Sequence, residues 1–160
     1  GDGNNVLHDL LLAGVSLGHD VKYATPEGME PNVEVIERAE KIARQTGAQI
    51  TATNDPSEAV TDAGVIYTDI FVSMGEEHMK DKFAAFEGFQ VNEELVSNAN
   101  DNYLFMHCLP AHRGEEVTDA VIDSKNSIVF DQAENRMWAQ MSLLTYMCNP
   151  IAWNAYRDLY

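Results

Sequence analysis

Short apolar runs alternate with helix-like segments along this chain, and this alternation constrains the fold more than any other feature. Turn residues and then a helical pattern follow each of the first four runs. Strand–helix–strand order needs crossover connections, which are right-handed and build parallel sheets. The sequence therefore predicts an α/β fold, with an open, mostly parallel sheet and helices on both faces. The expected strands are Val21–Ala24, Gln49–Thr53, Val65–Thr68, Tyr103–Met106 and Ser127–Phe130.

Helix signals lie between and after these runs. In the segment 33–46, apolar residues fall on one face and charged residues on the other, which predicts an amphipathic helix. Asp55–Glu58 combines an aspartate cap, a proline at the first helical position and a glutamate, and so predicts a helix start. Asp131–Glu134 repeats that signal before a long apolar helix. Asn149-Pro150 is expected to end this helix and to leave Ile151–Tyr160 as a separate amphipathic tail.

The size and charge of the chain limit its class. Its 160 residues are 45% apolar, which is enough for a single domain with an apolar core. No apolar run approaches the roughly 18 residues of a membrane span, and no signal peptide is recognisable. Cys108 and Cys148 are too few for a disulfide framework, so we expect reduced thiols in a cytoplasmic protein. The net charge of -16 disfavours nucleic acid and anionic membranes as partners.

The first residues form a loop that leads straight into an apolar helix, Val6–Leu17, with no strand before it. A βα unit that opens at its loop suggests a chain cut from a longer one. The opening Gly-Asp-Gly resembles a dinucleotide-binding turn, but Val6 stands where the third glycine is needed, which disfavours a nucleotide-dependent oxidoreductase. Asn4 and Asn5 at the helix start either form a plain turn or hydrogen-bond a zwitterionic ligand.

Asp69 and Cys108 each follow a predicted strand, at the edge where open α/β sheets bind ligands. If the strands are neighbours, a carboxylate and a thiol meet there, and together they could hold a substrate ammonium and take up its proton. The alternatives are that Asp69 caps a loop and that Cys108 is a small core residue. Strand alternation is expected to place His107 and Cys108 on opposite faces, which argues against a cysteine–histidine nucleophile pair.

Few other residues suggest a ligand site. Arg136 opens the long helix, at an end that does not favour a cation, so it either faces a ligand or pairs with Glu134 or Asp131. The remaining histidines show no metal-ligand spacing, so we predict neither a metal site nor a cofactor.

Several ordered motifs resemble the ornithine carbamoyltransferases of the aspartate/ornithine carbamoyltransferase family. Over roughly residues 1–140, the chain is similar to their C-terminal, ornithine-binding domain, which implies a Rossmann-like sheet. Phe71 stands where the family often has Trp, and the end of the chain, 141–160, matches less well. The matching segments are Asp2–Asn5, Asp69–Gly75 with Ser73 and Met74, His107–Pro110, Ala111–Val117 and Glu134–Arg136.

The resemblance implies transfer of a carbamoyl group from carbamoyl phosphate to the side-chain amine of L-ornithine, giving L-citrulline and phosphate. Asn5, Asp69, Ser73 and Met74 would then hold ornithine. Cys108, beside Asp69, would accept the amine proton. The carbamoyl phosphate end would meet Cys108, Leu109 and Arg136. The full-length enzyme of arginine metabolism would be a cytoplasmic homotrimer.

One feature of the family is missing from the chain. Carbamoyl phosphate needs clustered cations, but the five arginines are scattered and the family's Ser-Thr-Arg-Thr-Arg phosphate loop is absent. The family carries that loop in an N-terminal domain, so residues 1–160 are expected to form a single domain that is inactive alone. The rival interpretations are a carbamoyltransferase for another amine, such as putrescine or N-acetylornithine, and a non-catalytic amino-acid-binding or interaction domain.

Overall fold

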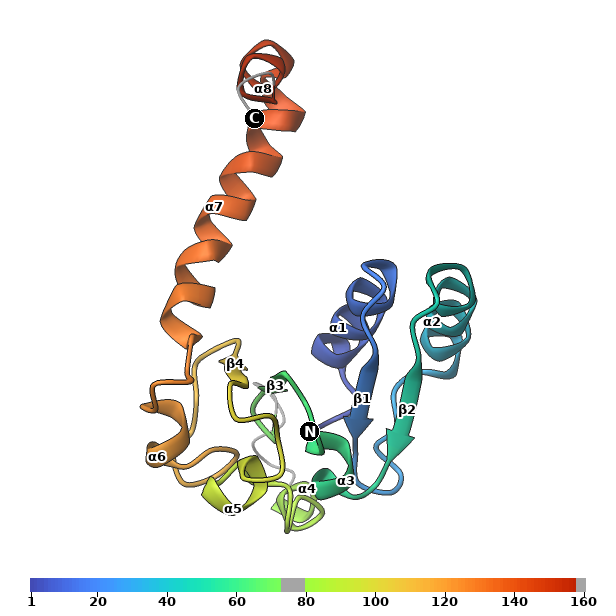
Figure 1. Cartoon of the computed structure of the whole chain (residues 1–160), viewed down its shortest axis with the longest axis vertical. Coiled ribbons are helices and arrows are strands. Elements are labelled where there is room, and N and C mark those ends of the chain that lie inside the picture. The colour runs from blue at the N-terminus through green and yellow to red at the C-terminus, as the bar shows by residue number, and fades with distance from the viewer. Residues whose placement is uncertain (73–79, 158–160) are drawn as a thin grey trace.

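The computed structural model describes residues 1–72 and 80–157 (Figure 1). Helices α1 and α2 lie side by side next to strands β1 and β2, while α7 extends away from the rest and carries α8 at its far end. The elements in chain order are α1 (Asn5–Ser16), β1 (Val21–Ala24), α2 (Val33–Thr46), β2 (Ile50–Thr53), α3 (Pro56–Val60), β3 (Val65–Thr68), α4 (Lys80–Ala84), α5 (Glu93–Val96), β4 (Leu104–His107), α6 (Asp119–Ile122), α7 (Val129–Cys148) and α8 (Pro150–Arg157).

All strand pairing among the described residues is parallel, as the alternation of strands and helices predicts. β1 pairs with β2 starting at Val21↔Ile50, and β3 pairs with β4 starting at Val65↔Leu104. A single parallel bridge, Phe105↔Ser127, continues beyond β4. The sheet is divided into two halves, β1–β2 and β3–β4. The predicted α/β, Rossmann-like class is confirmed.

The prediction of a fifth strand at Ser127–Phe130 is wrong. Only Ser127 bridges to a strand, and Val129 already begins α7. Val129 is buried in the main core as a helical residue, because a short apolar run has no period that distinguishes a strand from a helix start. Asp131 is accordingly not the cap of α7, since it lies in the first turn of that helix.

The other helix signals agree with the structure. α2 has the bounds expected from the segment 33–46 and is followed by Gly47, whose φ of 83° suits a residue without a side chain. α3 begins at Pro56, and the carboxylate of Asp55 caps it by accepting a hydrogen bond from the Ser57 amide at 2.8 Å. α7 ends at Cys148 and Pro150 opens α8, as predicted.

Three apolar clusters hold these elements together. The largest lies around β3 and β4, with Phe105 fully buried at its centre. A second joins α1 and α2 to β1 through Leu11, Val15 and Ala39. The third is aromatic: the ring of Phe71 stacks on that of Phe86 at a centroid distance of 4.4 Å, which anchors the segment that follows β3.

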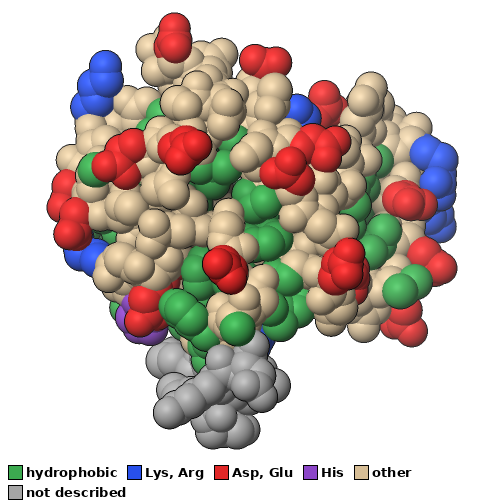
Figure 2. Space-filling view, turned by 90° about the horizontal axis from the view of Figure 1, so that it is seen from below, with side chains coloured by type: hydrophobic (Ala, Val, Ile, Leu, Met, Phe, Trp, Pro, Cys, Tyr) green, Lys and Arg blue, Asp and Glu red, His purple; other side chains and the backbone are tan. Residues whose placement is uncertain are grey.

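The surface has two notable features. Acidic side chains are spread over the face in Figure 2, around hydrophobic atoms near its middle, so the net charge of -16 is not gathered into one patch there. α7 exposes large apolar side chains along much of its length, among them Trp138, Met141 and Leu144. Among the described helices, none is long and apolar enough to span a membrane.

We expect Gly3→Ala to destabilise the protein. A Cβ at Gly3 would lie 2.3 Å from the carbonyl oxygen of Met29 and 2.4 Å from the carbonyl carbon of Glu30, and neither backbone atom can move freely. The amide of Gly3 also donates to that oxygen of Met29 at 3.0 Å. Urea unfolding should show a loss of about 1–3 kcal/mol. Gly64→Ala, where a Cβ meets nothing within 4 Å, is the matched control, and equal losses would contradict the prediction.

Candidate active site

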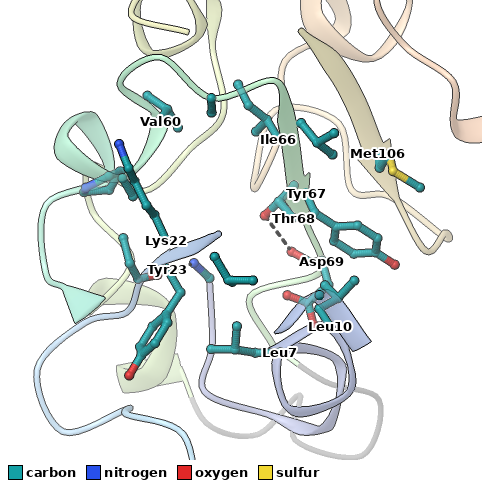
Figure 3. Close-up of a pocket in the computed structure, with 18 of the residues that line it drawn as sticks. Leu7, Leu10, Lys22, Tyr23, Val60, Ile66, Tyr67, Thr68, Asp69 and Met106 are labelled. Carbon is teal, nitrogen blue, oxygen red and sulfur yellow. Dashed lines mark hydrogen bonds between the residues drawn. The ribbon is translucent and has the colours of Figure 1, made fainter. Parts of the chain in front are cut away.

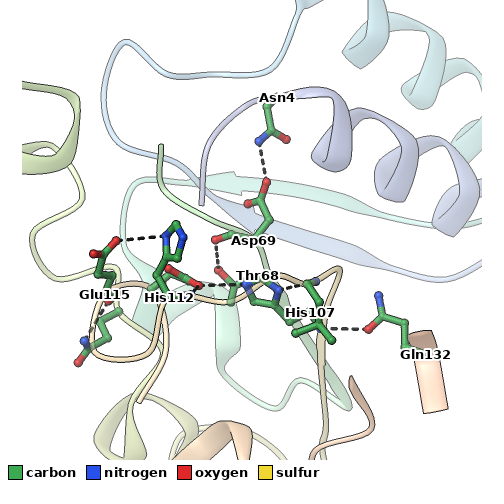
Figure 4. A network of polar contacts seen from close by, with 10 residues as sticks. Asn4, Thr68, Asp69, His107, His112, Glu115 and Gln132 are labelled. Carbon is green, nitrogen blue, oxygen red and sulfur yellow. Dashed lines mark hydrogen bonds and ion pairs between the residues drawn. The ribbon is translucent and has the colours of Figure 1, made fainter. Parts of the chain in front are cut away.

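The candidate site lies where β3 and β4 end. Thr68 and His107 are paired in the parallel register, so Asp69 and Cys108 directly follow paired residues at one edge of the sheet (Figure 4). Asp69 is 7% exposed, whereas Cys108 is an exposed free cysteine, and its sulfur is not turned into the core. The two predicted strands are therefore neighbours, and they bring a buried carboxylate and an accessible thiol to the same rim.

Asn4 holds the carboxylate of Asp69. Its side-chain amide donates to Asp69 Oδ2 at 2.6 Å, and its oxygen accepts the amides of Val6 at 2.9 Å and Leu7 at 3.3 Å as the cap of α1. Burial raises the pKa of Asp69, and the hydrogen bond from Asn4 opposes that rise by stabilising the carboxylate. Asn4 thus links the start of α1 to the end of β3. The sequence predicted Asn4 near the site but not its contact with Asp69.

A buried histidine–glutamate pair lies behind the rim. His107 Nε2 is 3.2 Å from Glu116 Oε1, and both side chains are completely buried. The amide of Leu109 donates to His107 Nδ1 at 2.9 Å, and the amide of His112 donates to Glu116 Oε1 at 2.6 Å. Leu109 has a φ of 54°, a left-handed conformation that this hydrogen bond helps to hold. The pair therefore fixes the turn that presents Cys108.

The protonation of His107 depends on opposing interactions. Burial alone would lower its pKa, but hydrogen bonds to Cys108 and Glu116 outweigh burial and raise the pKa to about 9. The amide of Leu109 needs a lone pair on Nδ1 and so favours the neutral ring, with its proton on Nε2 facing Glu116. Burial raises the pKa of Glu116, but hydrogen bonds from His107 and the His112 amide lower it overall. These two pKa directions favour a charged pair, but the hydrogen bond from the Leu109 amide needs an unprotonated Nδ1, so with this contact in place the ring is neutral.

Gln132 in α7 joins the two strands from outside. Its side-chain oxygen accepts the amide of His107 at 3.0 Å, and its nitrogen donates to the hydroxyl of Tyr67 at 3.0 Å. Burial and then the neighbouring charge of Cys108 raise the pKa of Tyr67 to about 12. Cys108 thus interacts with both Tyr67 and His107. The side chain of His107 is buried whereas Cys108 is exposed, which agrees with the expectation that these neighbours face opposite sides of β4.

The remaining predicted residues have different positions. Asn5 is the exposed first residue of α1, while Ser73 and Met74 lie outside the described residues. Arg136 does not open α7: it is the eighth residue of that helix, beyond the first turn in which the helix dipole acts on a charge. It lines a shallow surface depression of α7 beside Met137, away from the contacts made by Asp69.

Sequence reasoning missed Tyr67, Glu116 and Gln132. Tyr67 had a usable signal, because it precedes Asp69 by two residues on a strand that leads to the candidate rim. Glu116 had none, since it is one of 26 acidic residues and only the fold buries it. Among the described residues, His112, Glu115 and Glu116 are the one group with metal-ligand spacing. Glu116 is already engaged by His107 there.

Polar groups at the carboxyl ends of parallel strands define a ligand-binding α/β domain. Residues 1–147 match the family described as aspartate/ornithine carbamoyltransferase, Asp/Orn binding domain. The chain therefore belongs to this family.

Named relatives support this family membership. The catabolic ornithine carbamoyltransferase of Thermoplasma acidophilum is 57% identical over 145 residues, which cover 90% of this chain and 48% of the relative. The anabolic enzyme of Pyrococcus furiosus is 55% identical over 152 residues, which cover 94% and 48%. The chain spans about half the length of the curated relatives it matches.

Solved structures of ornithine carbamoyltransferases also support the family membership. The ornithine carbamoyltransferase of Pyrococcus furiosus superposes with a TM-score of 0.87 at 56% identity, over 91% of this chain and 47% of that one. The anabolic enzyme of Campylobacter jejuni superposes with a TM-score of 0.88 at 38% identity, over 94% and 50%.

We expect Glu116→Gln to lower the pKa of His107 from about 9, because the variant removes the buried charge that favours the protonated ring. The ring should then lose its proton at a lower pH, which NMR titration of its carbon-bound protons measures. Glu115→Gln is the matched control, since the carboxylate of Glu115 faces His112 at 3.4 Å instead. An unchanged His107 titration in the Glu116 variant would refute this coupling.

We expect Asn4→Asp to raise the pKa of Asp69 further, because a second carboxylate replaces the amide donor while the helix cap is kept. Carbon-13 NMR of the Asp69 carboxyl group measures the shift. Asn92→Asp, at the cap of α5, changes the same kind of residue elsewhere and should leave Asp69 unaffected. A lower pKa of Asp69 in the Asn4 variant would contradict the assigned contact.

Proposed function

We propose that this chain supplies the ornithine-binding half of an ornithine carbamoyltransferase. In the reaction, the side-chain amine of L-ornithine attacks the carbonyl carbon of carbamoyl phosphate, giving L-citrulline and phosphate. The observation that carries the proposal is the meeting of Asp69 and Cys108 at one strand edge, in a chain of this family. The choice of L-ornithine as the substrate comes from the relatives named above, which are called ornithine carbamoyltransferases.

The amine must lose a proton before it can attack, because its ordinary ammonium form has no lone pair. In this proposal the carboxylate of Asp69 holds the ammonium, and the hydrogen bond from Asn4 helps to keep that carboxylate charged. Cys108 in its thiolate form accepts the proton, beside the buried pair of His107 and Glu116. The nitrogen lone pair then forms the new C–N bond while the C–O bond to phosphate breaks. The departing phosphate takes up the second proton that the nitrogen must lose, which gives the neutral nitrogen of citrulline.

The other substrate contacts are assigned by the same proposal. Asn5, Ser73 and Met74 contact ornithine with Asp69, and Cys108, Leu109 and Arg136 contact carbamoyl phosphate. Leu109, with a φ of 54°, lies in the turn that follows β4, and we assign its backbone carbonyl and that of Cys108 to the carbamoyl group. Arg136 would have to reach the rim from α7.

A second half is needed to hold the phosphate. A multiply charged anion needs several cations, and in this chain Arg113 is already engaged by Asp119 and Asp123. We propose that an N-terminal domain binds the phosphate group of carbamoyl phosphate. We also propose that the full-length protein is a cytoplasmic homotrimer. The relatives with anabolic and catabolic names are almost equally identical to the chain, so identity does not separate arginine synthesis from breakdown.

We expect the full-length protein to form citrulline, and Cys108→Ala to reduce kcat by about 10²–10⁴-fold, the usual contribution of a proton acceptor. Cys148→Ala is the matched control, because it removes the other exposed cysteine, at the end of α7. The 160-residue chain alone should form no citrulline above its own Cys108→Ala variant.

A comparison of amines in the full-length protein tests the substrate. Faster turnover of putrescine or N-acetylornithine than of L-ornithine would show that the faster amine, and not L-ornithine, is the carbamoyl acceptor. Absence of turnover with all three amines would instead favour a non-catalytic binding domain.

A further inference from the structure

Tyr67 and Cys108 share one face of the strand pair β3–β4. In the parallel register Tyr67 pairs with Met106, and Figure 3 shows these two side chains next to each other. Side chains alternate between the two faces of a strand, so Cys108, two residues after Met106, projects from the same face. The buried Thr68 and His107 lie on the other face. Tyr67 is therefore the diagonal neighbour of Cys108 across the two strands.

Gln132 of α7 fixes the direction of the hydrogen bond at the Tyr67 hydroxyl. The side-chain oxygen of Gln132 accepts the amide of His107 at 3.0 Å, and a backbone amide can only donate. The other end of the Gln132 side chain is therefore its NH2 group, which donates to the Tyr67 oxygen at 3.0 Å. Because that oxygen is the acceptor in this contact, the hydroxyl proton of Tyr67 remains to be donated elsewhere.

The sulfur of Cys108 is the partner for that proton. Burial, then the negative charge of Cys108 and a hydrogen bond between the two side chains, raise the pKa of Tyr67 to about 12, although Gln132 opposes this rise. With so high a pKa, Tyr67 keeps its proton at neutral pH, so it is a hydrogen-bond donor and not a base. Hydrogen bonds to a charged acceptor such as a thiolate are stronger than those between neutral groups.

His107 is the other neighbour of the sulfur, but both of its ring nitrogens are engaged. Nδ1 accepts the amide of Leu109 at 2.9 Å, and Nε2 lies 3.2 Å from Oε1 of Glu116. With the ring proton facing Glu116, neither nitrogen has a proton to give to the sulfur. Of these two neighbours of Cys108, the phenol is therefore the one that can donate.

We propose that Tyr67, oriented by Gln132, donates a hydrogen bond to the thiolate of Cys108 and so keeps this sulfur ready to accept a proton. The role of the sulfur rests on the proposed function, whereas the contact itself does not depend on the substrate. The proton of the amine moves to the sulfur, while that of Tyr67 stays on its oxygen. Tyr67 acts through Cys108, so it is a positioning residue.

Alkylation of Cys108 by iodoacetamide tests the contact in the full-length protein, with peptide mass spectrometry to follow this cysteine alone. Tyr67→Phe removes the hydroxyl and keeps the ring. Loss of a hydrogen bond to a charged group should lower the thiolate fraction about tenfold. The remaining thiolate becomes more nucleophilic, which offsets about half of that factor on a logarithmic scale.

The variant should therefore react about threefold more slowly near pH 6.5, below the ordinary thiol pKa of about 8.5. Near pH 10.5, where nearly all of an ordinary thiol is ionised, it should react about threefold faster, because only the gain in nucleophilicity remains. Asp69, His107 and Glu116 are the same in both proteins, so their own titration affects both alike.

Tyr103→Phe is the matched control, because Tyr103 directly precedes β4, at the end of that strand away from Cys108. This variant should react like the unaltered protein at both pH values. A change of local structure alone would alter access to the sulfur and would move both rates in the same direction. Rates in Tyr67→Phe that move together, or that do not move, overturn the proposal.

Turnover separates this inference from the proposed function. Tyr67→Phe should lower kcat for citrulline formation about three- to tenfold and leave KM for L-ornithine within about twofold, because the hydroxyl acts on the sulfur and not on substrate binding. An unchanged kcat, in a protein that Cys108→Ala inactivates, overturns the positioning role and leaves the proposed function intact. Absence of citrulline from the unaltered protein overturns both together, while the alkylation rates still decide whether the contact exists.

Discussion

The parallel pairing of β3 with β4 is the constraint on which the candidate site depends. Its register aligns Thr68 with His107, and the next residue of each strand then reaches the same edge of the sheet. A slip of one residue would exchange the faces of His107 and Cys108, which would bury the thiol and expose the imidazole. The fully buried Phe105 and the contact between Gln132 and the His107 amide both oppose such a slip.

Local contacts rather than the overall charge govern the chemistry of the rim. The net charge of -16 is spread over the surface, and exposed charges are screened beyond about 8 Å at physiological salt. Asp69 and His107 are buried, so their nearest partners decide their charge. Burial pushes Asp69 toward the neutral acid, and Asn4 acts against it, while Glu116 draws His107 toward the charged ring. The charges of Asp69 and His107, next to Cys108, are thus set by their immediate neighbours.

The sequence predicts what depends on local pattern, and it fails where tertiary contacts decide. The period of 33–46 and the proline at position 56 give helix positions that agree with α2 and α3, because periodicity and capping are local. Ser127–Phe130 was misassigned because its residues suit a strand or a helix start equally well. Asp69 and Cys108 could be located because the ends of parallel strands share an edge. Glu116 could not be found, because its role depends on a loop that folds back under β4.

A short loop links the apolar cavity between β1 and β3 to the rim. Residues 1–4 connect the cavity between β1 and β3 to Asn4, which donates to Asp69. Asn4 also caps α1, so a shift of this loop would move both the start of the helix and the amide that stabilises the Asp69 carboxylate. The position of α1 and the charge of Asp69 are therefore coupled through one side chain.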